Sequence, residues 1–151
     1  MIDIQAILAA LESHALSTGR FERVNTHEPK SPPGNGVTSA IWVQRISPVP
    51  AGSGLAVTSG VVTFTQRLYQ NMLAEPQDAI DPELVAAADA MLAAYSGDYT
   101  LGGLVRNIDL LGATGTPLSA QAGYVTIDRT LHRVMDITVP CIVSDLWEQV
   151  P

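Results

Sequence analysis

Two stretches of this sequence carry apolar residues at helical spacing, and β-type segments lie between and after them. The first runs from Asp3 to Thr18, where Asp3 is placed to cap the helix and a glycine follows its end. The second runs from Pro82 to Ser96 and opens with an acid-proline-acid sequence typical of a helix start. Their stripes are Ile4, Ile7, Leu8, Leu11 and Ala15 in the first, and Leu84, Ala88, Met91, Leu92 and Tyr95 in the second.

The segment between the two helices predicts three strands. Phe21–Thr26 is a short one. Val37–Ile46 is apolar on both sides, because Val37, Ile41 and Val43 alternate with Ala40, Trp42 and Ile46. A turn rich in proline and glycine, Ser47–Gly54, then leads into the long β-prone run Leu55–Met72. The last two strands are expected to form a large hairpin.

The C-terminal third predicts a second hairpin. Leu104–Leu111 is apolar and β-compatible, Gly112–Ala120 is a long loop, and Gln121–Ile127 is expected to pair with Leu131–Val139. A three-residue connection would place Ile127 opposite Leu131, and a four-residue connection would place it opposite His132. Pro140 lacks an N–H, so the final strand either lies at a sheet edge there or bends before Trp147.

The order helix, strands, helix, strands predicts the fold class α+β. We expect a mainly antiparallel sheet with two principal helices packed on one face. The sequence shows no internal repeat, and its 151 residues suit a single domain covering residues 1–151.

The charge balance limits the partners of the chain. Acids outnumber bases by 15 to 8, and the bases are scattered, which argues against stable nucleic-acid binding. The charged share of 15% predicts a thinly charged exterior, as in proteins that lie inside assemblies. With no apolar stretch of the ~20 residues that a membrane span needs and no basic leader, we expect no membrane association and no export. The single cysteine, Cys141, fits a reducing cytoplasm.

The sequence contains none of the motifs typical of catalytic or metal-binding sites, and we expect no catalytic residue, metal site or cofactor. His14, His27 and His132 lie far apart and lack metal-ligand spacing. We expect His14 to lie at the surface near a helix end. No serine lies in a G-x-S-x-G motif, and Cys141 in an apolar strand is expected to be buried. Solvated faces and turns explain the spaced acids Asp128, Asp136 and Asp145 most simply.

The C-terminal third carries a run of distinctive motifs. They are Asp109-Leu110-Leu111-Gly112, Gly115-Thr116-Pro117-Leu118, Gly123-Tyr124, Val134-Met135-Asp136-Ile137-Thr138-Val139-Pro140 and Asp145-Leu146-Trp147. This run resembles the tail terminator proteins of long, non-contractile-tailed phages, particularly those that infect actinobacteria. The N-terminal part is similar more loosely, through an opening helix, a proline-rich loop and the strand around Trp42.

This resemblance implies a structural, non-enzymatic subunit of the virion. Proteins of this family form a ring, typically a homohexamer, on the finished tail tube. The ring stops polymerisation of the tail tube protein and gives the head–tail connector protein a docking surface. The resemblance thus implies a place at the head-proximal end of the tail after assembly in the host cytoplasm. DNA would cross the ring transiently without specific binding, and an acidic lumen would repel its phosphates.

Ring contacts are expected in the loops and at exposed aromatic residues, since a head-to-tail ring needs two unlike patches on each subunit. The loops are Glu28–Gly36, Ser47–Gly54 and Gly112–Ala120, and the candidate interface residues are Lys30, Pro32, Trp42, Pro50, Thr114, Pro117, Tyr124 and Trp147. Core packing is the competing interpretation for the aromatic residues.

Three other functions remain open. A head-completion or neck connector protein shares the small size and the ring. A small hydrolase using a serine or Cys141 would need a pocket with convergent polar groups. A domain of unrelated function with the same α+β plan is the third, because a fold does not determine a function.

Overall fold

The computed structural model describes residues 1–30, 36–50, 53–73 and 77–150. Within these ranges the chain forms two α-helices, two short 3-10 turns and six strands. In chain order they are α1 (Ile4–Ser17), β1 (Arg23–Asn25), β2 (Thr38–Val49), β3 (Val57–Asn71), a 3-10 turn (Gln77–Ala79), α2 (Ile80–Gly97), a 3-10 turn (Leu101–Gly103), β4 (Asn107–Ile108), β5 (Ser119–Ile127) and β6 (Thr130–Glu148).

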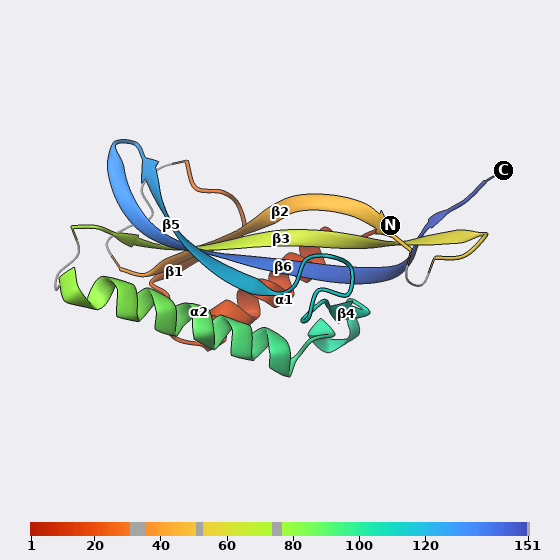
Figure 1. The fold of residues 1–151 in the computed structure, drawn as a ribbon, viewed down its shortest axis with the longest axis horizontal. Helices are drawn as coiled ribbons and strands as arrows, with labels where there is room; N and C mark the ends of the chain where they lie inside the picture. Colours follow the sequence, from red (N-terminus) through yellow and green to blue (C-terminus); the bar gives the residue numbers. More distant parts are fainter. Residues whose placement is uncertain (31–35, 51–52, 74–76, 151) are drawn as a thin grey trace.

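The strands form one sheet in the order β1-β2-β3-β6-β4, and β5 pairs with β6 on the same side as β4. The β1–β2 pair is parallel and every other pair is antiparallel. Both helices lie against one face of the sheet, and the long strands β3 and β6 run through its centre (Figure 1). The α+β prediction, with a mainly antiparallel sheet and helices on one face, is confirmed.

The main core lies between the helices and the sheet. Leu11 of α1, Met91 of α2, and Phe64 and Ile137 of the sheet are fully buried there. Burying one such side chain stabilises a fold by roughly 1.5–3 kcal/mol. A chain of buried hydrogen bonds also joins α2 to the sheet: the Tyr95 hydroxyl donates to the Gln66 side chain, whose Nε2 donates to Ser39 Oγ at 3.0 Å. This network fixes the position of α2 because buried polar groups must stay paired.

The opposite face of the sheet, called here the open face, carries a second, smaller cluster. Ala40, Tyr69 and Val134 are buried in it, and Trp42 and Val125 pack against them. The prediction that the second strand is apolar on both sides is therefore correct for its first half. Ile46 was assigned to the wrong side.

A bulge in β2 explains that error. The register between β2 and β3 shifts between Val43 and Arg45, so Gln44 is an extra residue. As a result Ile46 pairs with Val62, which belongs to the main core, and lies on the helix side of the sheet. A single inserted residue reverses the faces of all that follow.

The helix ends follow the predicted chemistry closely. Asp3 accepts a hydrogen bond from the Ala6 N–H at 3.1 Å, and Gly19 takes a positive φ of 66° just beyond α1. The second helix begins at Ile80, two residues earlier than expected. Pro82 fits there because the first N–H groups of a helix have no partner within it. His14, expected at the surface, is instead half-buried and bonded to Asp98 at 2.9 Å.

The hairpin of β5 and β6 has a two-residue connection, so both predicted registers are wrong. Ile127 lies opposite Thr130, and the turn residues Asp128 and Arg129 have φ values of 47° and 66°. Positive φ at both positions defines a type I′ turn, which usually contains Asn or Gly. The Asp-Arg sequence did not indicate it.

The final strand continues through Pro140 to Glu148 instead of lying at an edge. The Pro140 carbonyl accepts from the Asp109 N–H, so the proline nitrogen faces the same side, away from β3. The missing N–H therefore costs no bond to β3. The expected bend before Trp147 does occur, since Asp145 has a φ of 56° and donates its N–H to Ser59 Oγ.

Candidate functional site

The loop between β4 and β5 is organised by one buried carboxylate. Asp109 is 3% exposed and accepts hydrogen bonds from the N–H groups of Gly112, Ala113 and Thr114 and from the Thr114 hydroxyl. Burial alone would raise the pKa of Asp109, but the hydrogen bonds from the loop outweigh it and lower this pKa below its ordinary value. The loop is thus held in one conformation by a charged acceptor.

This loop and the end of the β2–β3 hairpin enclose a hollow of about 500 Å³ on the open face. Two predicted interface residues, Pro50 and Thr114, both line it, although 64 positions separate them in the sequence. The remaining lining residues are Gln44, Arg45, Ser47, Pro48, Val49, Val61, Thr63, Thr116 and Pro140. The walls are mainly proline, threonine and apolar groups, a lining suited to contact with another protein surface.

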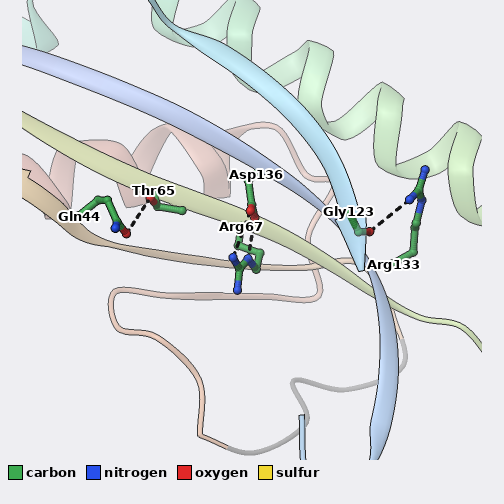
Figure 2. Close-up of polar contacts among 6 residues, drawn as sticks. All are labelled: Gln44, Thr65, Arg67, Gly123, Arg133 and Asp136. Carbon is green, nitrogen blue, oxygen red and sulfur yellow. Dashed lines mark hydrogen bonds and ion pairs between the residues drawn. The ribbon is translucent and has the colours of Figure 1, made fainter. Parts of the chain in front are cut away.

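Trp42 lies farther along the open face, beside an ion pair. Arg67 of β3 meets Asp136 of β6 with Nε–Oδ1 and Nη2–Oδ2 distances of 2.6 and 3.1 Å (Figure 2). The guanidinium also lies 5.4 Å from the Trp42 ring centre and 6.0 Å from that of Tyr69. The hydrogen bonds that Arg67 donates to Asp136 raise the pKa of Arg67, and burial raises the pKa of Tyr69 to about 12. Trp42 therefore packs within the chain, and Asp136 is paired rather than simply solvated.

Tyr124 is the most exposed of the three aromatic candidates, at 62%. It projects from β5 to the helix side of the sheet, where the Arg133 guanidinium lies 4.5 Å from its ring centre. Arg133 also donates to the Gly123 carbonyl at 3.2 Å (Figure 2). It donates as well to Asp81 of α2 at 3.0 Å. A hollow of about 350 Å³ beside Tyr124 is lined by Asp78 and Asp81, among others. The ring is thus held in place on one face and accessible on the other.

Trp147 occupies the place of a missing side chain. A Cβ added to Gly60 would lie 2.8 Å from the Trp147 ring, and Leu146 closes the same space at 3.0 Å. The half-buried indole thus packs on the backbone of β3. Core packing, the competing interpretation, explains Trp147 better than an interface does.

The other candidates do not gather at one place. Lys30 and Pro117 are exposed, and Pro117 packs against Gly112 of its own loop. Pro32 lies outside the described residues. The structure therefore brings Pro50 and Thr114 together and leaves Tyr124 as a separate exposed feature.

Titratable groups inside the chain do not converge on a pocket in the described ranges. Cys141 is fully buried and its pKa is raised to about 12 by burial. His132 is also fully buried, and its Nδ1 lies 3.1 Å from the Thr130 carbonyl. Its Nε2 has no hydrogen-bond partner among the residues described. Across these residues, no three His, Cys, Asp or Glu side chains lie close enough to hold a metal ion. No helix of residues 1–30, 36–50, 53–73 or 77–150 is long and apolar enough to cross a membrane.

Sequence reasoning missed the two uncovered edges of the sheet. In the described part of the chain β5 pairs only with β6, and β1 covers only Thr38–Ala40 of β2. No other strand of residues 1–30, 36–50, 53–73 and 77–150 lies on the outer side of β2. One signal was present, because Ser119–Ile127 contains no charged residue and no proline. Exposed edge strands usually carry such residues to prevent pairing with other chains.

Comparison with protein-family models finds no match, and comparison with curated proteins finds none. Among solved structures, the chain is similar to one chain of the structure titled "Virion of native gene transfer agent (GTA) particle". The similarity covers 94% of both chains, with 11% sequence identity and a TM-score of 0.39. This likeness is too distant to assign a function.

Proposed function

We propose that this chain is a structural virion protein that forms a ring on the end of a phage tail tube. The ring would end polymerisation of the tube protein and present a docking surface for the head–tail connector. The sequence motifs that resemble tail terminators support this role. The observation that carries it is the hollow between the Asp109-organised loop and the β2–β3 hairpin, where residues of two candidate loops lie together.

A preformed surface suits a subunit that must recognise the end of a tube. Because Asp109 already fixes the loop, little conformational entropy is lost when a partner binds. Leu111 of the same loop is 95% exposed and Leu55 of the β2–β3 connection is fully exposed. Exposed apolar side chains on ordered loops favour contact with a protein partner over contact with water.

The charge distribution bears on how DNA would cross the ring. The exposed acids Asp78, Asp81, Glu83 and Asp89 lie on or next to α2, whereas the open face carries the Arg67–Asp136 pair and Arg45. The lumen of the ring is therefore acidic only if α2 faces it. If the open face lines the lumen instead, the lumen is mainly polar and uncharged. DNA crossing the ring would then bind weakly to the wall and would not be repelled by it.

The test is tube growth in the presence of the purified chain. A phage tail tube protein is polymerised with and without the purified chain. The lengths and ends of the tubes are then measured by negative-stain electron microscopy. Short tubes with extra density at one end are expected. Tubes of unchanged length with bare ends would contradict the proposal. Binding to a connector alone, with unchanged tube growth, would indicate a neck protein instead.

The variant Asp109→Asn gives a second readout, because it weakens the charge-assisted hydrogen bonds that hold the loop. We expect it to reduce capping while leaving self-association intact. Ala113→Ser, an exposed position of the same loop whose side chain does not line the hollow, is the matched control and is expected to cap tubes as the unmodified chain does.

A further inference from the structure

We infer that neighbouring copies of this chain join by strand pairing between two unlike edges: β5 of one copy and the uncovered part of β2, Ile41–Ser47, of the next. This inference rests on the proposed ring, and it names the surfaces that build it. The occupant of the β5 edge is a second copy of this chain.

The first support is the state of the two edges. β5 is nine residues long, contains no charged residue and no proline, and directs the backbone N–H and C=O groups of alternate residues away from β6. Among the described residues, no strand pairs with the outer side of β2 from Ile41 onward. Pro48 cannot donate, so useful pairing on β2 ends near Ser47. Strand addition at such an edge gives main-chain hydrogen bonds without any change of fold.

The second support is the direction of the strands. β2 and β6 are both antiparallel to β3, so they run in the same direction. β5 is antiparallel to β6 and therefore also to β2. A neighbour generated by rotation about an axis near the strand direction keeps these directions. It would thus present its β2 antiparallel to β5, in the same sense as most pairs in this sheet.

The third support is a match of side chains. Tyr124 on β5 is 62% exposed and Ile46 on β2 is 47% exposed, and both project to the helix side of the sheet. A continuous sheet would place these two side chains on the same side at the join. Aromatic and β-branched residues form favourable cross-strand pairs, and pairing would remove both from water. Within one chain each side chain keeps about half of its surface or more exposed to water.

The acidic charge of α2 disfavours the symmetric alternative, in which the β5 strands of two copies pair with each other. Residues Met72–Val105 contain no Lys or Arg, and α2 places Asp81 beside the β5–β6 hairpin through its bond to Arg133. Pairing β5 with β5 would bring the acidic α2 helices of two copies together. Pairing β5 with β2 places α2 beside α1, which packs on β1 and β2 and holds one acid, Glu12.

The two uncovered edges are offset along the strands. β5 lies beside Thr130–Thr138 of β6, at the end of the sheet where β1 covers β2, while β4 occupies the side of β6 at Cys141 and Ile142 (Figure 1). A neighbour is therefore displaced along the strand direction. In closed sheets such a stagger is accommodated by tilting the strands against the ring axis. Because the two edges are unlike and lie on opposite sides of the sheet, each copy can bind a further copy until the ring closes.

The test uses charged substitutions at the two matched side chains. Tyr124→Lys and Ile46→Glu each place a charged side chain against an apolar side chain of the neighbouring copy. Each is therefore expected to lower the assembled fraction at least tenfold, as measured by sedimentation velocity. The double variant Tyr124→Lys/Ile46→Glu opposes unlike charges across the interface and should regain assembly. Val150→Lys is the matched control, because its side chain is exposed (85%) beyond the end of β6 and belongs to neither edge strand nor helix. It should assemble normally.

Each outcome has a defined meaning. Assembly that survives both single variants would refute the edge pairing while leaving a ring, and hence the proposed function, intact. Assembly lost with Tyr124→Lys but kept with Ile46→Glu would show β5–β5 pairing and overturn this inference. An unmodified chain that stays monomeric, alone and with tubes, would overturn both proposals. Circular dichroism and thermal melting of every variant separate lost assembly from lost folding.

Discussion

Arg67 and Asp136 face each other across adjacent central strands, and their side chains form a two-pronged ion pair with Nε–Oδ1 at 2.6 Å. The Arg67 side chain is only 22% exposed and lies between this carboxylate and the Trp42 ring. The pair connects the two longest strands on the face that no helix covers.

The first prediction concerns this pair. Asp136→Asn should lower the free energy of unfolding by about 1–2 kcal/mol, because a half-buried guanidinium loses a charged acceptor. Urea denaturation measures the change. Asp89→Asn, an exposed position on α2, should shift stability by less than about 0.5 kcal/mol. Equal effects of the two substitutions would mean that the pair contributes nothing beyond surface charge.

The second prediction is a pH dependence from His132. Burial lowers its pKa, and the Thr130 carbonyl only partly opposes this shift. The unfolded chain therefore binds a proton at higher pH than the folded chain does. Stability should be fully present above about pH 6.5 and fall as the pH drops toward the lowered pKa.

His132→Gln should remove this fall, and thermal melting between pH 7.5 and pH 5 measures it. His27→Gln changes an exposed histidine and should leave the slope as it is. The account of His132 fails if its replacement leaves the slope unchanged and His27→Gln flattens it.

The third prediction concerns the fit of Trp147 over Gly60. Gly60→Ala places a Cβ within 3.0 Å of the indole and Leu146, so the ring must move. Overpacking of this kind typically costs about 1–3 kcal/mol. In a Trp42→Phe background, the fluorescence of Trp147 should shift to the red. Adding Trp147→Leu should recover part of the stability, and a red shift without loss of stability would contradict close packing.

The fourth prediction is a stabilising substitution in the β5–β6 turn. Arg129 has a φ of 66°, a conformation that glycine adopts without strain. Arg129→Gly should raise the free energy of unfolding by about 0.5–1 kcal/mol, because a type I′ turn favours glycine at this position. Arg129→Val should lower it, since a β-branched residue is strained at positive φ. Chemical denaturation of both variants measures the two shifts, and effects of the same sign would contradict the turn type.

The sequence predicts best where local chemistry determines structure. Asp3 caps the first helix as its position indicated, and the spacing of Leu84, Ala88 and Met91 identified the buried side of the second. Both features depend on residues within one or two turns of each other. The fold class follows from the order of such elements.

The sequence predicts less where one backbone position changes the geometry of a strand. The extra residue Gln44 places Ile46 on the helix side, and positive φ at Asp128 and Arg129 sets the register of the last hairpin. The residue types at Gln44, Asp128 and Arg129 do not predict a bulge or a type I′ turn. Pro140 predicts either a sheet edge or a bend before Trp147; its nitrogen faces away from β3, so the strand continues through it and bends only near Asp145.

The candidate interface residues lie at several separate places in the structure. Loop residues Pro50 and Thr114 do meet at one hollow. Trp42 and Trp147 pack within the chain, because an aromatic side chain serves a core as well as an interface. The uncovered edges are a property of strand order, which sequence patterns do not contain.

Amide hydrogen exchange tests the edge pairing most directly, comparing the chain diluted below its assembly concentration with the assembled ring. Pairing of unlike edges predicts that peptides covering Ser119–Ile127 and Ile41–Ser47 become protected together, while exchange along β3, which is paired on both sides within one chain, stays unchanged. A ring in which β5 exchanges as fast as in the free chain would contradict the account.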